Sequence, residues 1–536
     1  MFVQNPSQPW LFSNPLAFWT GCALIAAGVF AHLPMFLMGA ANGYRMVGMP
    51  MDATMLTGMG LIPVGLALAA FGLMPDTVLR SKGPAVPLDF KLADNARLNR
   101  QHWLLVIALI VAVTVDVMKP ATLGFVMPGL RTEYELAPST AGMLPLFALT
   151  GTIVGSILWG RIADLIGRRG AILLSALMFM GTAICGAMPA FGWNLLMCFL
   201  MGTSAGGMLP ITFTLLAEVI PARHRGWMLV ALGGIGTAAG YLVASSSAWL
   251  LEPSYSWRSL WLLGLPTGLI VIVFHQLIPE SPRYLAASGR PEQARAVMQR
   301  FGAAKVDTTA PAGPAAESVP AAKLGYRALL SGPYAAITIG LFGTGAAYGL
   351  VNIGFLLWLP TSLRLLGLEP ELVSSMLTMS GLLALPGVFL VIPLYQMWSS
   401  IRTVALVTLM TALSLLVYAT TGILAPTWAP GIIVSIALVL VSTSAVVATL
   451  IPYASEIYPL ELRASGTGLI AASSKAGGFI GALLGFLGIY SHMAIVGGLL
   501  ALPMAGFGLL LWVRGIDTRG RRLEDIQGDV MARASN

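Results

Sequence analysis

Two opposite charges lie three positions apart inside a long apolar stretch of this chain. Residues 114–124 read TVDVMKPATLG, and Asp116 and Lys119 there interrupt a run that is otherwise apolar from Trp103 to Met127. Residues three apart are neighbours on a helix surface, so the carboxylate and the ammonium can neutralise each other. Protonation of Asp116 would release Lys119, which makes Asp116 the leading candidate for a proton carrier. The alternative interpretation is a static pair that only lets the helix enter an apolar environment.

A third charge, Lys475, interrupts a different apolar run. It stands in RASGTGLIAASSKAGG, residues 463–478. A charge of this kind costs roughly 2.5–3.5 kcal/mol at the centre of a membrane helix, so it is expected to face the protein interior. A buried ammonium is a good point-charge partner for the carboxylate of a ligand. The alternative is that Lys475 is permanently paired with an acidic residue as a structural contact.

The composition places these charges in an integral membrane protein. Of the 536 residues, 57% are hydrophobic and 10% are charged, whereas about a quarter are charged in an average soluble protein. A run of about 20 apolar residues spans the hydrocarbon core of a bilayer. The sequence predicts about fourteen such runs, at 16–39, 55–74, 103–127, 139–159, 170–190, 194–217, 226–250, 258–278, 333–358, 374–394, 403–425, 430–454, 465–489 and 491–513.

The depth of the three charges follows from the ends of their helices. Asp116 lies about thirteen residues after Trp103, and Lys475 about ten after Ser465, which at about 1.5 Å per residue gives about 20 Å and about 15 Å. We therefore expect the charges near the middle of the bilayer.

The basic residues predict the orientation. When both termini are placed in the cytoplasm, only four of the 30 Lys and Arg residues fall outside and two fall within the membrane. The four outside are Arg45, Arg131, Arg258 and Arg364. The two within the membrane are Lys119 and Lys475. This distribution follows the positive-inside rule, and anionic lipid headgroups account for the net charge of +8 without a nucleic-acid partner. We expect a multi-pass protein of the plasma membrane, specifically a bacterial inner membrane.

The longest polar stretch divides the later helices into six and six. We predict an N-terminal transmembrane hairpin with a basic linker (1–102), a six-helix bundle (103–278), a cytoplasmic central loop (279–332), a second six-helix bundle (333–513) and a cytoplasmic tail (514–536). EVIPARHR at 218–225 and EIYPLELR at 456–463 share the pattern E-x-x-P-x-x-x-R, which indicates an internal repeat of the kind that many transporters contain. The hairpin glycines Gly58, Gly60, Gly65 and Gly72 are predicted to pack against the core or a second copy of the chain.

Two motifs carry a resemblance to a known family. GRIADLIGRRG at 160–170 resembles the loop signature G-x-x-x-D-x-x-G-R-R of the major facilitator superfamily. PESPRYL at 279–285, together with the repeated E-x-x-P-x-x-x-R pattern, resembles the sugar-porter and organic-ion branches, which include aromatic-acid symporters. The resemblance covers about residues 103–513 and implies the major-facilitator fold, with two six-helix bundles and, here, two additional N-terminal helices. The second half departs from the pattern, because YQMWSSIRT at 395–403 retains little of the signature beyond Arg402.

The resemblance also implies a cytoplasmic gating network that holds the outward-open state. We expect Gly160 and Gly167 to permit a tight turn, and the charged side chains to pair in one conformation and separate in another. The predicted members are Gly160, Arg161, Asp164, Gly167, Arg168, Arg169, Glu218, Arg225, Glu280, Arg283, Glu456 and Arg463.

In this fold the first and eleventh core helices, which carry the three membrane charges, line a central cavity. In the organic-ion and aromatic-acid branches the position of Lys475 tends to hold a cation in carriers of anions. The predicted substrate-binding residues are Lys475, Lys119, Tyr241, Tyr348, Asn352, Phe147, Phe355 and Phe479, with Asp116 as the proton-coupling residue.

The sequence therefore predicts a secondary active transporter that moves a small organic anion, preferably a carboxylate, by alternating access in symport with protons. Its expected partners are the substrate, protons and the lipid bilayer. Cys22, Cys185 and Cys198 have no metal-site spacing, and no nucleophile, metal or phosphate-binding constellation indicates an enzyme or a cofactor. Two alternatives remain open, a proton-driven exporter of drugs or metabolites and a non-transporting membrane sensor. Substrate identity, direction, coupling ion, stoichiometry and oligomeric state are left open.

Overall fold

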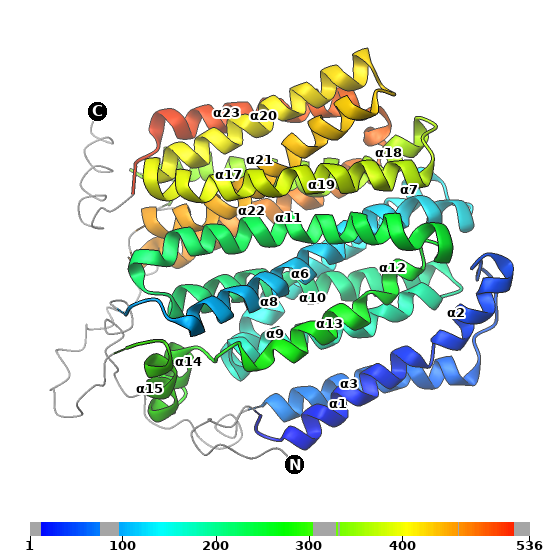
Figure 1. Ribbon diagram of the computed structural model, residues 1–536, viewed down its shortest axis with the longest axis horizontal. Coiled ribbons are helices and arrows are strands. Elements are labelled where there is room, and N and C mark those ends of the chain that lie inside the picture. The colour runs from blue at the N-terminus through cyan, green and yellow to red at the C-terminus, as the bar shows by residue number, and fades with distance from the viewer. Residues whose placement is uncertain (1–11, 75–95, 304–328, 331–332, 459, 519–536) are drawn as a thin grey trace. The chain divides into compact units, whose positions relative to one another are not determined.

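The computed structural model describes residues 12–74, 96–303, 329–330, 333–458 and 460–518 (Figure 1). Within these ranges every regular element is a helix and none is a strand. A bilayer offers no water to backbone N–H and C=O groups, and a helix satisfies them within one segment. In the described part of the chain, 14 helical segments are long and apolar enough to cross a membrane. The expected all-α integral membrane fold is confirmed.

The helices follow the order of the predicted apolar runs. The N-terminal hairpin and the first six core spans consist of α1 (Pro15–Phe30), α2 (Leu33–Gly39), α3 (Ala53–Leu73), α6 (Arg100–Glu133), α7 (Pro138–Ala141), α8 (Met143–Ile166), α9 (Arg168–Thr182), α10 (Phe191–Val219), α11 (Ala222–Tyr255), α12 (Ser259–Leu262) and α13 (Gly264–Val273). Two short helices follow, α14 (Pro282–Ala287) and α15 (Pro291–Arg300). The later spans consist of α17 (Ala335–Gly349), the π-helix η4 (Leu350–Leu356), α18 (Leu357–Leu365), α19 (Pro370–Pro393), the π-helix η5 (Leu394–Trp398), α20 (Ser400–Leu424), α21 (Ala429–Ile457), α22 (Leu460–Phe486), η6 (Ile489–His492) and α23 (Met493–Arg514).

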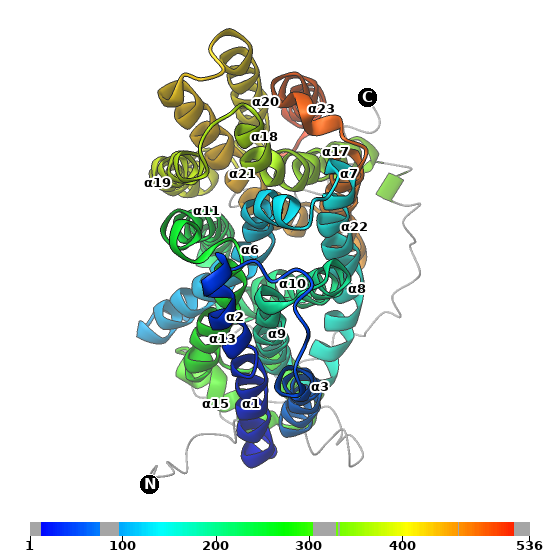
Figure 2. The same cartoon turned by 90° about the vertical axis from the view of Figure 1, so that its right-hand side faces the viewer.

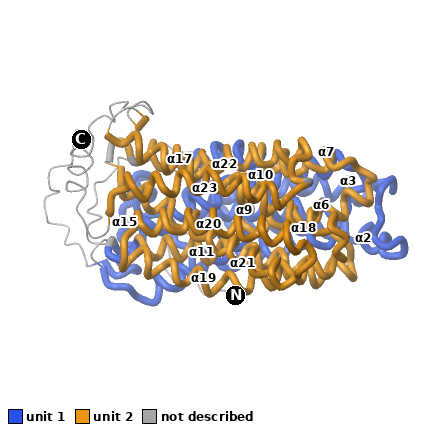
Figure 3. Tube along the Cα trace, turned by 90° about the horizontal axis from the view of Figure 1, so that it is seen from above, with its two compact units in different colours: residues 1–115, 151–225, 258–315 blue, residues 116–150, 226–257, 316–536 orange. Residues whose placement is uncertain are grey.

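The chain forms two compact units (Figure 3). Unit 1 contains residues 1–115, 151–225 and 258–315, and unit 2 contains residues 116–150, 226–257 and 316–536. The boundary within α6 lies immediately before Asp116. The units do not follow the predicted bundles, whose division at 279–332 stays a prediction. All three membrane charges belong to unit 2.

The N-terminal hairpin of unit 1 is held together by glycines. Helices α1 and α3 run side by side (Figure 2), and a Cβ added at Gly21 would lie 2.5 Å from the Gly65 carbonyl oxygen. Gly58 and Gly72 likewise face α1 or the residues after it, whereas Gly60 has open space around it. These glycines therefore pack inside the hairpin, and the expectation that they face the core or a second copy is wrong for three of the four. The hairpin meets α9 through other side chains, including Ile62 near Gly181.

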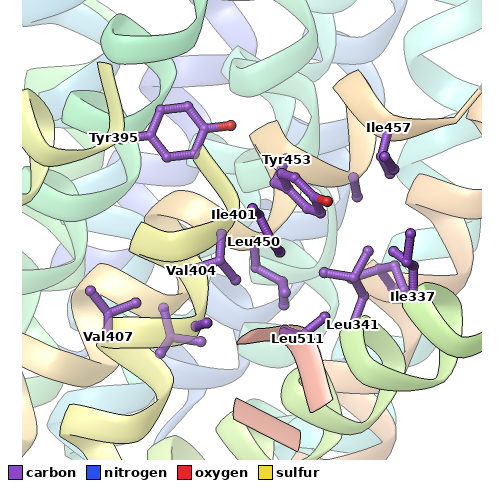
Figure 4. Packing of buried hydrophobic residues seen from close by; sticks show 14 of the residues in the cluster. Ile337, Leu341, Tyr395, Ile401, Val404, Val407, Leu450, Tyr453, Ile457 and Leu511 are labelled. Atoms are coloured by element: carbon purple, nitrogen blue, oxygen red, sulfur yellow. The ribbon is translucent and has the colours of Figure 1, made fainter. Parts of the chain in front are cut away.

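Unit 2 has its own buried hydrophobic cluster (Figure 4). Ile337 and Leu341 of α17 pack there with Leu450 and Tyr453 of α21 and with Leu511 of α23. The Tyr453 hydroxyl donates a hydrogen bond of 2.8 Å to the carbonyl of Ile516. This packing fixes α17, which continues directly into the π-helix that carries two of the predicted site residues.

Candidate functional site

The charged pair on α6 is present and buried. The Lys119 Nζ lies 3.4 Å from Asp116 Oδ1, and the two residues are 1% and 5% exposed. Both lie in a 34-residue helix that continues through Pro120 and Pro128. A lone charge at this depth is costly, and the mutual contact lowers that cost for both.

Lys475 joins the same electrostatic group. It lies on α22, where its side chain is half-buried, and the negative charge of Asp116 acts on its ammonium group. Two ammonium groups and one carboxylate thus carry a combined charge of +1 when all are ionised. Such a group favours an anion with one negative charge, since binding it brings the local sum to zero.

Glycines bring α22 against the helix that carries Tyr348 and Asn352. A Cβ at Gly477 would lie 1.9 Å from the Ala346 carbonyl oxygen, and a Cβ at Gly349 would lie 1.9 Å from that of Ser474. Only glycine permits such backbone contact, as at small-residue interfaces of other membrane helices. Ser474, immediately before Lys475, and Gly477, two residues after it, are therefore in contact with α17.

The predicted polar residues of α17 and η4 lie at a break in helix geometry. The Asn352 Nδ2 donates a hydrogen bond of 3.0 Å to the Tyr348 hydroxyl, and both side chains are half-buried. Asn352 stands in the π-helix Leu350–Leu356. Short π-helical turns within α-helices are frequent at functional sites. The propensities of LVNIGFL do not signal this turn, so sequence reasoning missed it.

The predicted aromatic residues fall into different environments. Tyr241 on α11 is 8% exposed, its hydroxyl has no hydrogen-bond partner within the described residues, and its ring lies 6.3 Å from that of Phe125. Phe355 is fully buried and packs edge-on against Tyr418 at 4.9 Å, which supports a packing role. Phe147 is 37% exposed and Phe479 is half-buried. Their assignment to the substrate site stays a prediction.

An ion pair that the sequence did not predict joins α11 to α18. Arg364 Nη2 donates to both carboxylate oxygens of Glu252, at 2.8 and 2.7 Å. Both side chains are largely buried, with exposures of 15% and 12%. The two residues are 112 positions apart, so no local sequence pattern connects them. The one signal for the pair was an acidic residue, Glu252, just after the apolar run 226–250.

At the α8–α9 turn of unit 1, a buried carboxylate caps a helix. Glu280 Oε1 accepts hydrogen bonds from the backbone N–H groups of Arg168 at 2.7 Å, Arg169 at 3.4 Å and Ser281 at 2.9 Å. The N-terminus of α9 has unpaired N–H groups and a positive dipole end, which favour this carboxylate. Burial raises the pKa of Glu280, and the three N–H groups and Arg169 offset the effect only in part.

Gly167 makes this capping possible. Its φ of +95° is disfavoured for other residues, and a Cβ there would lie within the Glu280 carboxylate. Gly160, by contrast, lies inside α8 and has room for a Cβ. The expectation of a turn at Gly160 is therefore wrong. Of the two glycines, only Gly167 is needed for the turn.

Other predicted network residues of the first half make local contacts. Arg168 Nη1 lies 3.2 Å from Asp164 Oδ1, but the carboxylate side chain is 73% exposed, so the pair contributes little. Glu218 accepts a hydrogen bond from the Ser281 hydroxyl, and Arg225 donates to the Ile220 carbonyl at 3.4 Å.

In the second half, Glu456 accepts hydrogen bonds from the hydroxyls of Tyr395 at 3.2 Å and Thr518 at 2.6 Å. Arg161 is exposed, and the Arg283 side chain has interactions of its own. The side chain of Arg463 lies outside the described part of the structure.

Known proteins resemble this chain over most of its length. Residues 104–482 match the Major Facilitator Superfamily. The niacin transporter NiaP of Acinetobacter baylyi is 24% identical over 445 residues, which cover 81% of this chain and 98% of that protein. The gallate transporter of Pseudomonas putida is 28% identical over 440 residues, which cover 80% and 95%. The structure of the proton:xylose symporter XylE bound to 6-bromo-6-deoxy-D-glucose matches with a TM-score of 0.62 and 16% identity, covering 80% of this chain and 98% of that one.

Proposed function

We propose that this chain, which belongs to the Major Facilitator Superfamily, imports a small aromatic carboxylate across the plasma membrane in symport with protons. Membership of the family makes it a membrane transporter rather than an enzyme. The niacin and gallate transporters that resemble it carry aromatic acids according to their names, which supports the substrate class. The proposed orientation has both termini in the cytoplasm.

One observation carries the proposal, namely the group of Asp116, Lys119 and Lys475 in unit 2. The pair on α6 is buried at 3.4 Å, and Lys475 interacts electrostatically with the same carboxylate. A proton bound at Asp116 alone would raise the net charge of the group by one. An anion bound at Lys475 at the same time would lower that charge by one again. Substrate and proton thus favour each other, which is the thermodynamic requirement of symport.

The cytoplasmic gating network would control which side of the membrane the site faces. The Glu280 contacts with Arg168 and Arg169 bring the α8–α9 turn to the segment before α14. In the proposed cycle these contacts form in the outward-open state and separate when the cytoplasmic side opens. In the proposed orientation the loop after α11 lies outside the cell, so the Glu252–Arg364 pair lies at the outer end of α11.

The test is transport by the purified chain in proteoliposomes. An imposed inward pH gradient is expected to drive accumulation of labelled niacin or gallate, and Lys475→Ala is expected to abolish it. Asp116→Asn is expected to abolish accumulation while exchange of internal for external substrate continues, because the amide cannot release a proton. If no aromatic acid moves with the gradient, the substrate class is wrong. If Asp116→Asn accumulates substrate normally, the α6 pair is structural.

A further inference from the structure

The carboxylates near the middle of the helices limit the number of protons that one transport cycle can carry. Asp116 stands 16 residues after Arg100, where α6 begins, and 17 before Glu133, where it ends. Every other Asp or Glu of the described helices lies at most three residues from a helix end. Lys119 and Lys475 are the two Lys or Arg residues of these described helices that lie more than five residues from an end. The charged group therefore contains a single carboxylate that can accept a proton.

The helices that contact α6 in unit 2 do not supply a second proton site. Contacts of α6 with α11 and α18 include those made by Phe125 and Gly124. The charged residues of these two helices in unit 2 are Glu252 and Arg364. Both carboxylate oxygens of Glu252 accept from the Arg364 Nη2, at 2.8 and 2.7 Å. Protonation of Glu252 would leave the buried guanidinium without its counter-charge, which is costly.

The helices packed against α22 in unit 2 do not supply one either. They include α17, η4, α21, α7 and η6. Glu456 stands one residue before the end of α21 and accepts two hydroxyl hydrogen bonds, and His492 is the last residue of η6. The other titratable side chains of these helices, and those of α11 in unit 2, are phenols, which keep their protons at neutral pH.

The net charge of the group determines how the membrane potential acts on the cycle. The two ammonium groups and the Asp116 carboxylate together carry one positive charge in the empty transporter. A proton at Asp116 adds one charge, and a monoanion at Lys475 removes it again. The empty and the loaded transporter therefore carry the same charge, so the membrane potential does not drive either step.

A second carboxylate on the substrate would disturb this balance. A dianion that enters with one proton carries one negative charge into a cell whose interior is negative. A potential of about 100 mV acting against one charge lowers accumulation by about fiftyfold. A single proton site is therefore suited to monocarboxylates and not to dicarboxylates.

We infer that the substrate is an aromatic monocarboxylate, which enters with one proton per molecule in an electroneutral cycle driven by the pH gradient alone. The inference rests on the proposed function, because it assigns a charge and a stoichiometry to the same transport step. It excludes the membrane potential as a driving force and aromatic dicarboxylates as accumulated substrates.

The experiment is uptake of labelled niacin into proteoliposomes that contain the purified full-length chain, with valinomycin and K⁺ setting the potential. Without a potential, an inward gradient of about one pH unit is expected to give about tenfold accumulation, because each proton contributes about a factor of ten per pH unit. Adding an inside-negative potential of about 100 mV is expected to leave that ratio unchanged. Labelled phthalate, an aromatic dicarboxylate, is expected not to accumulate under both gradients together. Protein-free liposomes measure passive entry of each acid.

A second measurement counts the proton without transport. Niacin binding to the detergent-solubilised chain in weakly buffered solution is expected to take up no more than one proton per bound molecule, and binding to Asp116→Asn none. Glu371→Gln, which changes an exposed carboxylate of the same unit, is expected to match the wild type. Thermal unfolding checks that each variant is folded. Uptake of more than one proton, or uptake that persists in Asp116→Asn, overturns the inference.

The transport outcomes separate the inference from the proposed function. Niacin accumulation that changes with the potential, or that reaches about a hundredfold under one pH unit, overturns the electroneutral cycle and leaves proton-coupled import standing. Accumulation of phthalate against the potential overturns the assigned substrate charge. If neither gradient drives accumulation of niacin or of any other aromatic acid, the proposed function itself is wrong.

Discussion

Glu280 is a residue whose protonation is linked to the stability of the α8–α9 turn. Burial raises its pKa above the ordinary carboxyl value of 4.5. A carboxyl group with a raised pKa in the folded state contributes stability that is fully present below the unfolded pKa and is lost as the pH rises through the folded pKa. The wild-type chain is therefore expected to lose thermal stability from Glu280 as the pH increases above about 4.5.

Glu280→Gln is expected to remove this pH dependence. The amide oxygen still accepts the N–H groups of Arg168 and Ser281, but it does not titrate, so the melting temperature of the variant should change less between pH 5 and pH 8 than that of the wild type. Glu280→Ala is the matched control, because it leaves the buried N–H groups without an acceptor and should lower the melting temperature at every pH. Parallel pH profiles for wild type and Glu280→Gln would contradict the assignment.

At the scale of elements, the ion pair between Glu252 and Arg364 ties α11 to α18. Removal of one partner from a buried pair typically costs about 3–5 kcal/mol, because the other charge stays buried. Glu252→Gln and Arg364→Gln are each expected to lower the melting temperature clearly, and the exchanged double variant Glu252→Arg with Arg364→Glu should recover much of the loss. Glu371→Gln, an exposed acidic residue of α19, serves as the control. Additive effects in the exchanged variant would show that the two side chains do not interact.

The contact between α17 and α22 depends on glycine at a defined position. A Cβ at Gly477 would lie 1.9 Å from a backbone oxygen of α17, and relief requires the helices to separate beside Lys475. Gly477→Ala is expected to lower both thermal stability and substrate affinity. Gly468→Ala on the same helix meets open space and should be neutral or stabilising by about 0.5–1 kcal/mol, since alanine favours helix. Equal melting temperatures for the two variants would contradict this packing.

The sequence predicts the elements better than their contacts. Apolar runs are set by local composition, so hydropathy located the spans that contain Asp116 and Lys475. The interaction between these two residues depends on the approach of α6 and α22, and no periodicity encodes it. Glycines show a similar limit: Gly58 and Gly65 were visible as a small-residue face, but only the packed structure shows that α1 covers it. The π-helical turn at Asn352 has no local signal at all.

At the scale of the whole molecule, we expect the additional N-terminal hairpin to be separable from the proposed transport site. Its glycine contacts are internal to α1 and α3, the residues of the charged group all lie in unit 2, and the family match begins at residue 104. A chain that begins at residue 96 is expected to transport substrate with unchanged affinity. Lipid is as apolar as the hairpin, so the newly exposed face of α9 loses packing contacts but gains no aqueous surface.

The hairpin segment makes polar contacts that deletion removes, one of which is a hydrogen bond of 3.4 Å from the Gly48 N–H to the Pro189 carbonyl. The Phe12 ring lies 6.0 Å from the guanidinium of Arg169, a side chain that is 9% exposed beside Glu280. The shortened chain is therefore expected to melt at a lower temperature while its transport in proteoliposomes continues. Phe12→Ala in the full-length chain separates the effects, since it removes the ring and keeps the hairpin, and it should reproduce part of the loss. Loss of transport by a shortened chain that melts like the wild type would instead place the hairpin within the transport cycle.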